Sequence, residues 1–145
     1  MKHFLPLLLL LLTLLPAHAI KKFEANPINI AAVIVEKTDS ANVASTLSFY
    51  GYAFQNNEDG YTVMKHPNGN EIRYSFNRTE DRFPIVVLKT KGTRKSLDAK
   101  LSELYFEKSG KGYERIRNMY SQYKTHCGFG PNGALIFSRK LNKKE

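Results

Sequence analysis

After its N-terminal segment, the chain alternates between apolar runs and amphipathic stretches, which predicts a mixed α+β fold. The stretch INIAAVIVEK, residues 28–37, is mostly apolar and rich in β-branched side chains, as is typical of a buried strand. The next stretch, TDSANVASTLSFYGYAF, residues 38–54, spaces apolar side chains three or four residues apart, which places them on one face of a helix. Asp39 or Ser40 is suited to cap that helix, and Gly51 with the QNNEDG that follows is expected to end it. The predicted helix face, and candidate core, consists of Val43, Leu47, Tyr50 and Phe54.

The pattern then predicts a hairpin, a further strand and a second helix. Residues 60–76, GYTVMKHPNGNEIRYSF, contain two strand-like runs around Asn68-Gly69, a dipeptide that tolerates the positive φ angles of a tight hairpin turn. FPIVVLKTKG, residues 83–92, predicts a strand. TRKSLDAKLSELYFEK, residues 93–108, predicts a helix with Thr93 as its cap. The apolar face of this helix is formed by Leu97, Leu101 and Leu104.

The two halves of the chain share an order of signals, which predicts an internal repeat. The corner Pro-Asn-Gly at residues 67–69 recurs at residues 131–133, and a strand-like run follows each copy. An offset of 54 residues aligns the apolar positions of the two predicted helices, and an offset of 52 aligns a Gly-Tyr pair. Several matches in the same order indicate a structural duplication. We therefore predict two βαββ units, residues 28–76 and 83–140, with the repeated corner as the hairpin turn of each.

The second unit is longer than the first, because it contains an insert around RNMYSQYKTH, residues 117–126. Residues 113–127 fit a helical stripe, whereas YKTHCGF, residues 123–129, equally fits the first strand of the second hairpin. A short helix or loop that leads into a strand is favoured. The expected architecture is one α+β domain, in which helices pack on one face of a mainly antiparallel sheet and leave the other face free to bind.

Residues 1–19, MKHFLPLLLLLLTLLPAHA, predict a secretory signal peptide. They combine a basic start, an apolar run from Phe4 to Leu15 and an Ala-His-Ala ending, which is the three-part pattern of such signals. The apolar run is shorter than the roughly 20 residues of a membrane-spanning helix, so no transmembrane segment is expected after cleavage near Ala19. Residues 20–145 suffice for one compact domain. The expected location is the periplasm or the medium.

The basic charge of the chain favours acidic partners. Its 22 Lys and Arg residues outnumber 13 Asp and Glu residues, for a formal net charge of +9, and signal cleavage removes only Lys2 from this set. Anionic lipids, envelope polymers, nucleic acids and acidic proteins are all attracted by such a charge. The basic residues are scattered along the chain, which favours the simpler interpretation of a solvated surface. Nucleic acid is not the expected partner, because the chain has no RNA- or DNA-binding motif and is predicted to be exported.

Few residues beyond the signal segment have chemistry suited to catalysis. His66 and His126 are the imidazoles of that part, and Cys127 is its one thiol, so no internal disulfide forms and a buried thiol is expected. His126 and Cys127 are adjacent, and neighbours in a strand point to opposite faces, which prevents activation of the thiol by the histidine. His66, Glu71, His126 and Cys127 show no spacing that would hold a metal. We predict no catalytic residue, no metal site and no cofactor.

The predicted order of elements carries one resemblance to a known family. LSFYGYAF, residues 47–54, and HPNGNEIRYSF, residues 66–76, resemble the helix and last strands of a module of the vicinal-oxygen-chelate superfamily, and duplicated βαββ units resemble its element order. The resemblance implies a metal-dependent enzyme with His, Gln or Glu ligands on the first and last strands of each module. Here the predicted first strands contain no His, and only Glu71 stands where a ligand is expected. A metal-dependent enzyme is therefore the third function hypothesis, and its metal site is not carried over.

The aromatic residues supply the other function hypotheses. The chain has eight Tyr and nine Phe residues but no Trp, and several tyrosines are close to charged residues in the sequence. Tyr and Arg are enriched where proteins contact one another. We therefore expect a small exported binding protein, not an enzyme, that binds or neutralises another envelope protein as an inhibitor or immunity protein does. The alternative is a basic module that binds an anionic envelope polymer or lipid. The candidate contact residues are Arg73, Tyr74, Tyr113, Arg115, Tyr120 and Tyr123.

Overall fold

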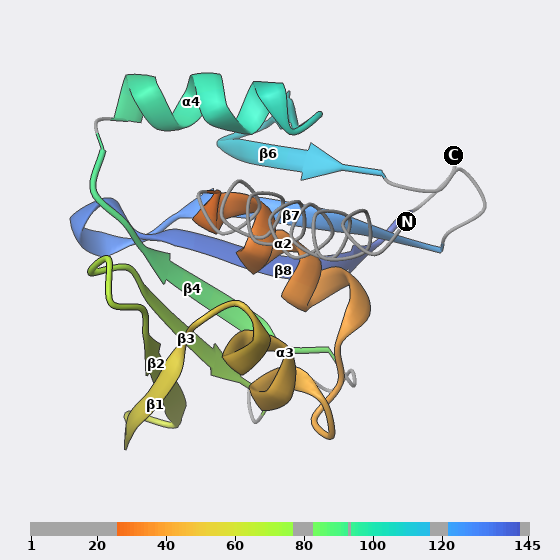
Figure 1. Ribbon diagram of the computed structural model, residues 1–145. Coiled ribbons are helices and arrows are strands. Elements are labelled where there is room, and N and C mark those ends of the chain that lie inside the picture. The colour runs from red at the N-terminus through yellow and green to blue at the C-terminus, as the bar shows by residue number, and fades with distance from the viewer. Residues whose placement is uncertain (1–25, 77–82, 93, 117–121, 143–145) are drawn as a thin grey trace, which may run out of the picture.

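The computed structural model describes residues 26–76, 83–92, 94–116 and 122–142, and the predicted signal peptide lies outside the described residues. In the described part, three α-helices and eight strands form an α+β fold (Figure 1). The helices are α2 (Pro27–Lys37), α3 (Val43–Phe49) and α4 (Arg94–Glu103), and a short 3-10 helix covers Pro131–Gly133. The strands are β1 (Ala53–Glu58), β2 (Tyr61–Lys65), β3 (Glu71–Ser75), β4 (Ile85–Lys89), β5 (Glu107–Ser109), β6 (Gly112–Arg115), β7 (Tyr123–Phe129) and β8 (Leu135–Leu141).

All eight strands belong to one antiparallel sheet with the order β1-β2-β3-β4-β8-β7-β6-β5. This order is symmetric about the β4–β8 pair. Each half consists of a helix followed by four strands, α3 with β1 to β4 and α4 with β5 to β8. The predicted α+β class and the antiparallel sheet are confirmed. Two tandem βαββ units are not confirmed, because the element before α3 is a helix, whereas in the second predicted unit β4 does precede α4, β5 and β6. The vicinal-oxygen-chelate-like order, which requires two such units, is therefore not confirmed either.

Residues 28–37, predicted as a strand, form most of helix α2. The helix starts after Asn26, whose side chain accepts a hydrogen bond from the Asn29 N–H at 3.3 Å, and Pro27 occupies the first turn. Both features favour a helix start. Ile28 and residues 30–35 are buried, because α2 packs against β4, β7, β8 and α3. A helix buried on most sides is apolar nearly all round, so its sequence has no periodicity that separates it from a buried strand.

The other predicted elements form, with shifted boundaries. The hairpin predicted for residues 60–76 is β2 with β3, the strand within residues 83–92 is β4, and the second helix is α4. The first predicted helix ends at Phe49, and part of the stretch expected to be a loop forms β1. Phe54 was predicted to be a core residue of that helix, but it lies in β1 and is 58% exposed. The ambiguous segment 113–127 contains the end of β6 and the start of β7, and residues 117–121 within it lie outside the described part.

The two Pro-Asn-Gly corners do not occupy equivalent places in the two halves. Residues 67–69 lie between β2 and β3, the second connection of the first half. Residues 131–133 join β7 to β8, the third connection of the second half. The shared tripeptide therefore reflects shared turn chemistry, since Pro, Asn and Gly each suit tight turns for local reasons.

The ends of α3 and α4 do match. The N–H of Tyr52 donates to the C=O of Leu47 at 3.0 Å, and the residues 54 positions later repeat this bond at the same distance. The residue before each donor has a positive φ, 88° at Gly51 and 67° at Tyr105. This hydrogen bond around a left-handed residue is the Schellman motif of helix ends. The offset of 54 seen in the sequence thus marks structurally equivalent positions.

One hydrophobic core fills the space between the helices and one face of the sheet. Buried side chains from α2, α3 and α4 join those of the strands in a single cluster, and Figure 1 shows α2 crossing the central strands. On β3, Ile72 faces this core, whereas Glu71 and Arg73 face the opposite side, which we call the open face. No helix of the described part covers the open face. None of these helices has both the length and the apolar character required to cross a bilayer.

Candidate functional site

A hollow at the β5 end of the sheet combines exposed apolar side chains with a free strand edge. It has a volume of about 390 Å³ and lies where the chain leaves α4 and enters the β5–β6 hairpin. β5 ends the sheet and pairs only with β6 among the described strands. The residues that line this site, called the edge hollow below, are Tyr105, Glu107, Lys108, Ser109, Glu114 and Ile116.

Tyr105 has an unusual conformation in the edge hollow. Its φ of 67° lies in the left-handed region, which costs a residue other than glycine roughly 1–2 kcal/mol. Gly51 occupies the equivalent position of α3, and glycine is the usual residue at such helix ends. Tyr105 is 85% exposed, so contacts inside the domain do little to offset the strain. Strained residues of this kind are concentrated at functional sites.

Ile116 adds a second exposed apolar side chain to the edge hollow. It directly follows β6 and is 51% exposed. Glu107, Lys108 and Glu114 line the hollow together with these two apolar side chains. Surfaces that bind another protein commonly combine apolar and charged side chains.

Glu114, which lines the edge hollow, takes part in an ion pair and lies beside a histidine. Lys124 Nζ lies 3.0 Å from Glu114 Oε2, and His126 is opposite Glu114 in the β6–β7 pairing. Burial acts to raise the pKa of Glu114, but Lys124, Ser109 and His126 together hold this pKa below its usual value. Burial lowers the pKa of His126, and the positive charges of Lys140 and Lys124 lower it further against the opposing effect of Glu114. The neutral form of the His126 imidazole is therefore favoured in the folded protein.

The lowered pKa of His126 predicts a loss of stability in mild acid. The unfolded chain takes up a proton near pH 6.5, whereas the folded protein does so only at lower pH, so the free energy of unfolding falls as the pH decreases through this window. We expect the wild-type protein to lose stability between about pH 7 and about pH 5.5, above the range in which carboxylates titrate. The His126→Gln variant should lose less stability than the wild type over the same pH range. Urea unfolding at both pH values measures the difference, and His66→Gln is the control for removal of an imidazole. Equal losses in His126→Gln and wild type would contradict this origin.

Arg73, one of the six contact residues predicted from sequence, lies on the open face of β3. Its Nε donates to Glu71 at 2.8 Å, and its Nη2 is 3.3 Å from a Glu58 oxygen. Burial acts to raise the pKa of Glu71, but Arg73, Lys89 and Lys65 together hold this pKa below its usual value. The Arg73 guanidinium is therefore held in an ion-pair cluster of the open face.

Three of the predicted tyrosines are turned towards neighbouring side chains of the domain. Tyr74 is half-buried and packs against the core. Tyr113 is 3% exposed, and its hydroxyl donates a hydrogen bond to Asp98. Tyr123 is half-buried and packs edge to face against Phe83, with 5.0 Å between ring centroids. Among these three, only Tyr74 and Tyr123 retain surface that a partner can reach.

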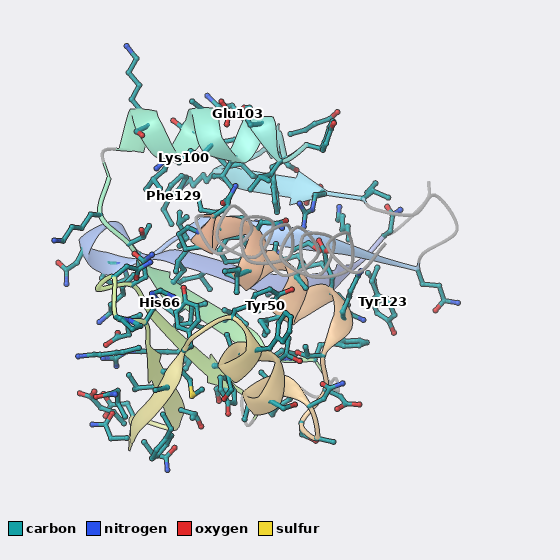
Figure 2. All side chains as sticks on the ribbon, viewed as in Figure 1. Tyr50, His66, Lys100, Glu103, Tyr123 and Phe129 are labelled. Atoms are coloured by element: carbon teal, nitrogen blue, oxygen red, sulfur yellow. The ribbon has the colours of Figure 1, made fainter. Side chains whose placement is uncertain are left out.

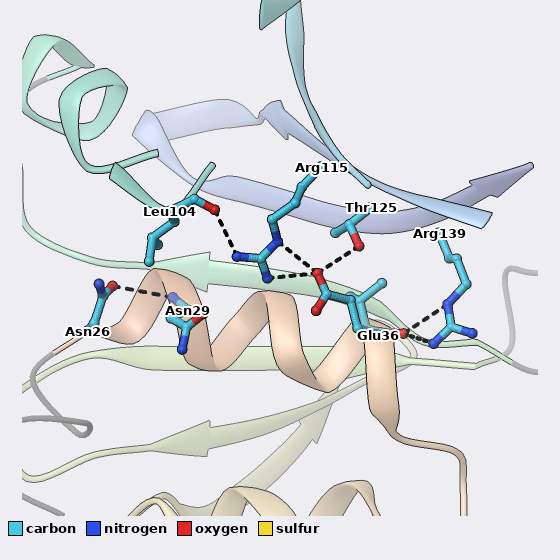
Figure 3. Close-up of polar contacts among 8 residues, drawn as sticks. Asn26, Asn29, Glu36, Leu104, Arg115, Thr125 and Arg139 are labelled. Atoms are coloured by element: carbon cyan, nitrogen blue, oxygen red, sulfur yellow. Dashed lines mark hydrogen bonds and ion pairs between the residues drawn. The ribbon is translucent and has the colours of Figure 1, made fainter. Parts of the chain in front are cut away.

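Arg115 is buried in a polar network between α2 and the sheet (Figure 3). Its Nε and Nη2 donate to Glu36 Oε1 at 3.0 and 2.7 Å, and its Nη1 donates to the Leu104 carbonyl at 3.1 Å. The Thr125 hydroxyl donates to the same Glu36 oxygen at 3.0 Å. The side chains of Arg115 and Glu36 are only 4% and 10% exposed. In this position Arg115 connects elements of the domain and presents almost no surface to a partner.

The structure does not bring the predicted contact residues together. Tyr113 packs against Phe129, with ring centroids 6.1 Å apart, and Figure 2 shows Phe129 and Tyr123 at opposite ends of β7. The two candidates on β3 are separated from β7 by β4 and β8. Tyr120 lies outside the described residues.

Sequence reasoning missed the two exposed apolar residues of the edge hollow. The offset of 54 pairs Gly51 with Tyr105, so a tyrosine stands where the first half has a helix-ending glycine. That mismatch was visible in the sequence and would have singled out Tyr105. No comparable signal marks Ile116, because its exposure depends on how β6 ends.

The thiol and the imidazoles form no reactive group in the described part of the chain. Cys127 is buried, and burial raises the pKa of its thiol to about 12, so the thiol is protonated and a poor nucleophile at neutral pH. Within the described residues, no three His, Cys, Asp or Glu side chains are grouped so that they could hold a metal ion.

Comparisons with known proteins assign no family. No protein-family model, no curated protein and no solved structure matches the chain. The function proposed for the protein therefore depends on the geometry of the edge hollow and on the sequence pattern.

Proposed function

We propose that this chain is a small exported protein that binds another protein, has no catalytic activity of its own, and docks its partner at the edge hollow. The observation that carries the proposal is the state of Tyr105, which combines a φ of 67° with 85% exposure. A glycine would relieve the backbone strain at no loss of internal packing. The presence of a tyrosine there is explained if its ring contacts a partner.

The chemistry of the edge hollow suits a protein partner. A tyrosine ring buries a large area on binding, has few rotatable bonds, and also offers a hydroxyl for hydrogen bonding. An apolar side chain of the partner that enters the hollow contacts both Tyr105 and Ile116. The free edge of β5 offers backbone N–H and C=O groups to an extended segment of the partner. Glu107, Lys108 and Glu114 then select the partner by charge.

Export and the absence of a catalytic role are further parts of the proposal. Residues 1–19 have the pattern of a secretory signal, which supports a partner in the envelope or the medium. A single small domain that carries a binding site and an unreactive thiol is suited to block or neutralise another protein. An inhibitor or immunity role is therefore the proposed class.

Affinity capture tests the proposed function. The tagged protein is incubated with envelope and culture extracts at low and moderate salt, and the retained material is identified by mass spectrometry. We expect one protein in stoichiometric amount that survives the higher salt, because a packed interface responds only modestly to ionic strength. Retention of polyanionic material alone, lost at higher salt, would contradict the proposal and favour the anionic-ligand alternative.

Substitution of Tyr105 separates binding from stability. Tyr105→Gly is expected to raise the free energy of unfolding by about 1 kcal/mol, because glycine adopts the left-handed conformation without strain. The same change should weaken partner binding at least about tenfold, since it removes the central ring. Tyr105→Ala should weaken binding without the gain in stability, because alanine keeps the strain. Urea unfolding and binding titration measure the two effects.

The matched control is Phe49→Ala, which removes an aromatic side chain that is 70% exposed on α3. This variant should bind the partner like the wild type. Wild-type affinity in Tyr105→Gly would place the partner elsewhere on the protein. A loss of stability in that variant would mean that the tyrosine ring serves the fold.

A further inference from the structure

The opposite end of the sheet presents a second free edge, strand β1. β1 pairs only with β2 in the described part of the chain, and all six of its residues are exposed. A strand of this length at the end of a sheet offers a row of backbone N–H and C=O groups that another strand can pair with. The edge at β5 is half as long, with three residues.

The sequence of β1 lacks two of the residues that usually protect such an edge, Lys and Pro. Proteins discourage edge pairing with Lys or Pro on the edge strand, and AFQNNE, residues 53–58, contains neither. The central side chains, Gln55, Asn56 and Asn57, are amides, which both donate and accept hydrogen bonds and are therefore complementary to themselves. Lys and Arg outnumber Asp and Glu in the chain, but β1 contains no Lys or Arg. A second copy therefore meets no positive charge on the strand itself.

β1 contains a bulge, a feature that can also protect an edge strand, and here the bulge makes the two ends of the strand compatible with a two-fold pairing. Ala53 is opposite Lys65 and Glu58 is opposite Tyr61 in the β1–β2 register, with an irregularity between Phe54 and Asn56. In a regular strand, residues five apart point to opposite faces. The extra residue of the bulge shifts the alternation of faces by one position. Ala53 and Glu58 therefore both point to the open face. When two copies pair antiparallel with Ala53 of one opposite Glu58 of the other, the opposed side chains at both ends of the pair therefore lie on the same face of the sheet.

This register also places opposite charges near one another. Glu58 of one copy lies beside Ala53 of the other, and Lys65 is the next residue across the sheet. Glu58 of one copy and Lys65 of the other are thus two strand spacings apart, about 10 Å. Their long side chains can meet across this distance because the residue between them, Ala53, is small. Within one copy, Glu58 lies 3.3 Å from Arg73 and Lys65 lies 3.9 Å from Glu71. Their side chains are half-exposed, at 50% and 55%, so both can also reach across to a second copy. The two-fold axis produces this contact twice.

We propose that two copies of this protein pair antiparallel through β1 to form a dimer with one continuous sheet. The contacts that define it are the backbone ladder of β1, the amide side chains at its centre, and the Glu58–Lys65 contacts at its two ends. Phe54, which is 58% exposed, lies on the helix side of the strand and is opposite Asn57 of the other copy in this register. The dimer leaves β5 and the edge hollow free, because β5 is at the other end of the sheet.

Sedimentation equilibrium of the purified protein across a wide range of concentrations tests the dimer. We expect the mass to rise from that of a monomer to that of a dimer, with no larger species, because each copy has one β1 edge. Asn56→Lys places a positive charge near the axis in both copies and should raise the dissociation constant at least about tenfold. Ser109→Lys puts the same charge on the other edge and should leave the dissociation constant unchanged. Circular dichroism establishes that both variants remain folded.

A charge exchange tests the register. Glu58→Lys should weaken the dimer, and Glu58→Lys with Lys65→Glu should restore it, because the exchanged charges meet again across the axis. A protein that stays monomeric at every concentration overturns the proposal, as does a dimer that persists in Asn56→Lys. Either result would leave the partner site at the edge hollow unaffected, since that site does not depend on β1.

Discussion

Replacing Arg115 with Ala is expected to lower the free energy of unfolding by about 3–5 kcal/mol. The substitution leaves the Glu36 carboxylate, which is 10% exposed, without the guanidinium that donates to it at 3.0 and 2.7 Å (Figure 3). The Leu104 carbonyl also loses its donor. A buried charge without its partner is far costlier than the pair is stabilising, because the charge has given up its hydration. Since small domains are stable by roughly 5–15 kcal/mol, this is a large share of the total.

Urea unfolding of three variants separates the causes of this loss. Thr125→Val removes one hydrogen bond to the same carboxylate oxygen and should lower the free energy of unfolding by about 1 kcal/mol. This milder variant still tests the contribution of the network if Arg115→Ala fails to fold. The double variant Glu36→Leu with Arg115→Met removes both charges and should be more stable than Arg115→Ala, because it leaves no buried carboxylate that has lost its guanidinium. A double variant less stable than the single one would argue against this account. So would Arg115→Ala with wild-type stability.

The same residue shows what local sequence leaves undetermined. Arg115 stands beside a tyrosine and a glutamate in the sequence, a neighbourhood that favours an exposed contact residue. Its partner is Glu36, 79 positions away, and no local pattern reports so distant a pairing. Tyr113, on the same strand, was misjudged for the same reason, because its burial depends on Phe129 and Asp98. The candidate site was therefore the part of the molecule least accessible to prediction.

The fold was more predictable than the site, wherever one strong local rule applied. The β2–β3 hairpin follows from its Asn-Gly turn, and α4 follows from its leucine spacing. Helix α2 was missed because a helix buried on most sides loses its periodicity. Strand β1 was missed because QNNE is polar, and an edge strand exposed along its whole length shows no alternation. The antiparallel class was correct even though two tandem βαββ units are not confirmed, because the class depends on short strands joined by turns.

Gly112→Ala is expected to lower the free energy of unfolding by about 1–3 kcal/mol. A Cβ at this position would lie 2.5 Å from the Cys127 carbonyl oxygen and 3.0 Å from His126 Nε2. The carbonyl belongs to the backbone of β7 and cannot rotate away, so β6 must move from β7. That movement disturbs the strand that carries both Tyr113 and Arg115. The sequence aligned Gly112 with a turn glycine of the first half, but here glycine is required by close approach of two strands.

Gly92→Ala is the matched control for this prediction. Its Cβ would meet only Leu97 side-chain atoms at 3.6 Å, an ordinary van der Waals distance, so the variant should be as stable as the wild type or more stable by up to about 1 kcal/mol, because alanine restricts the unfolded chain. Urea unfolding of both variants gives the comparison. Equal free energies of unfolding for Gly112→Ala and Gly92→Ala would mean that β6 and β7 separate without cost. The close approach at Gly112 would then play no part in holding the β5–β6 hairpin, which carries the edge hollow, against the rest of the sheet.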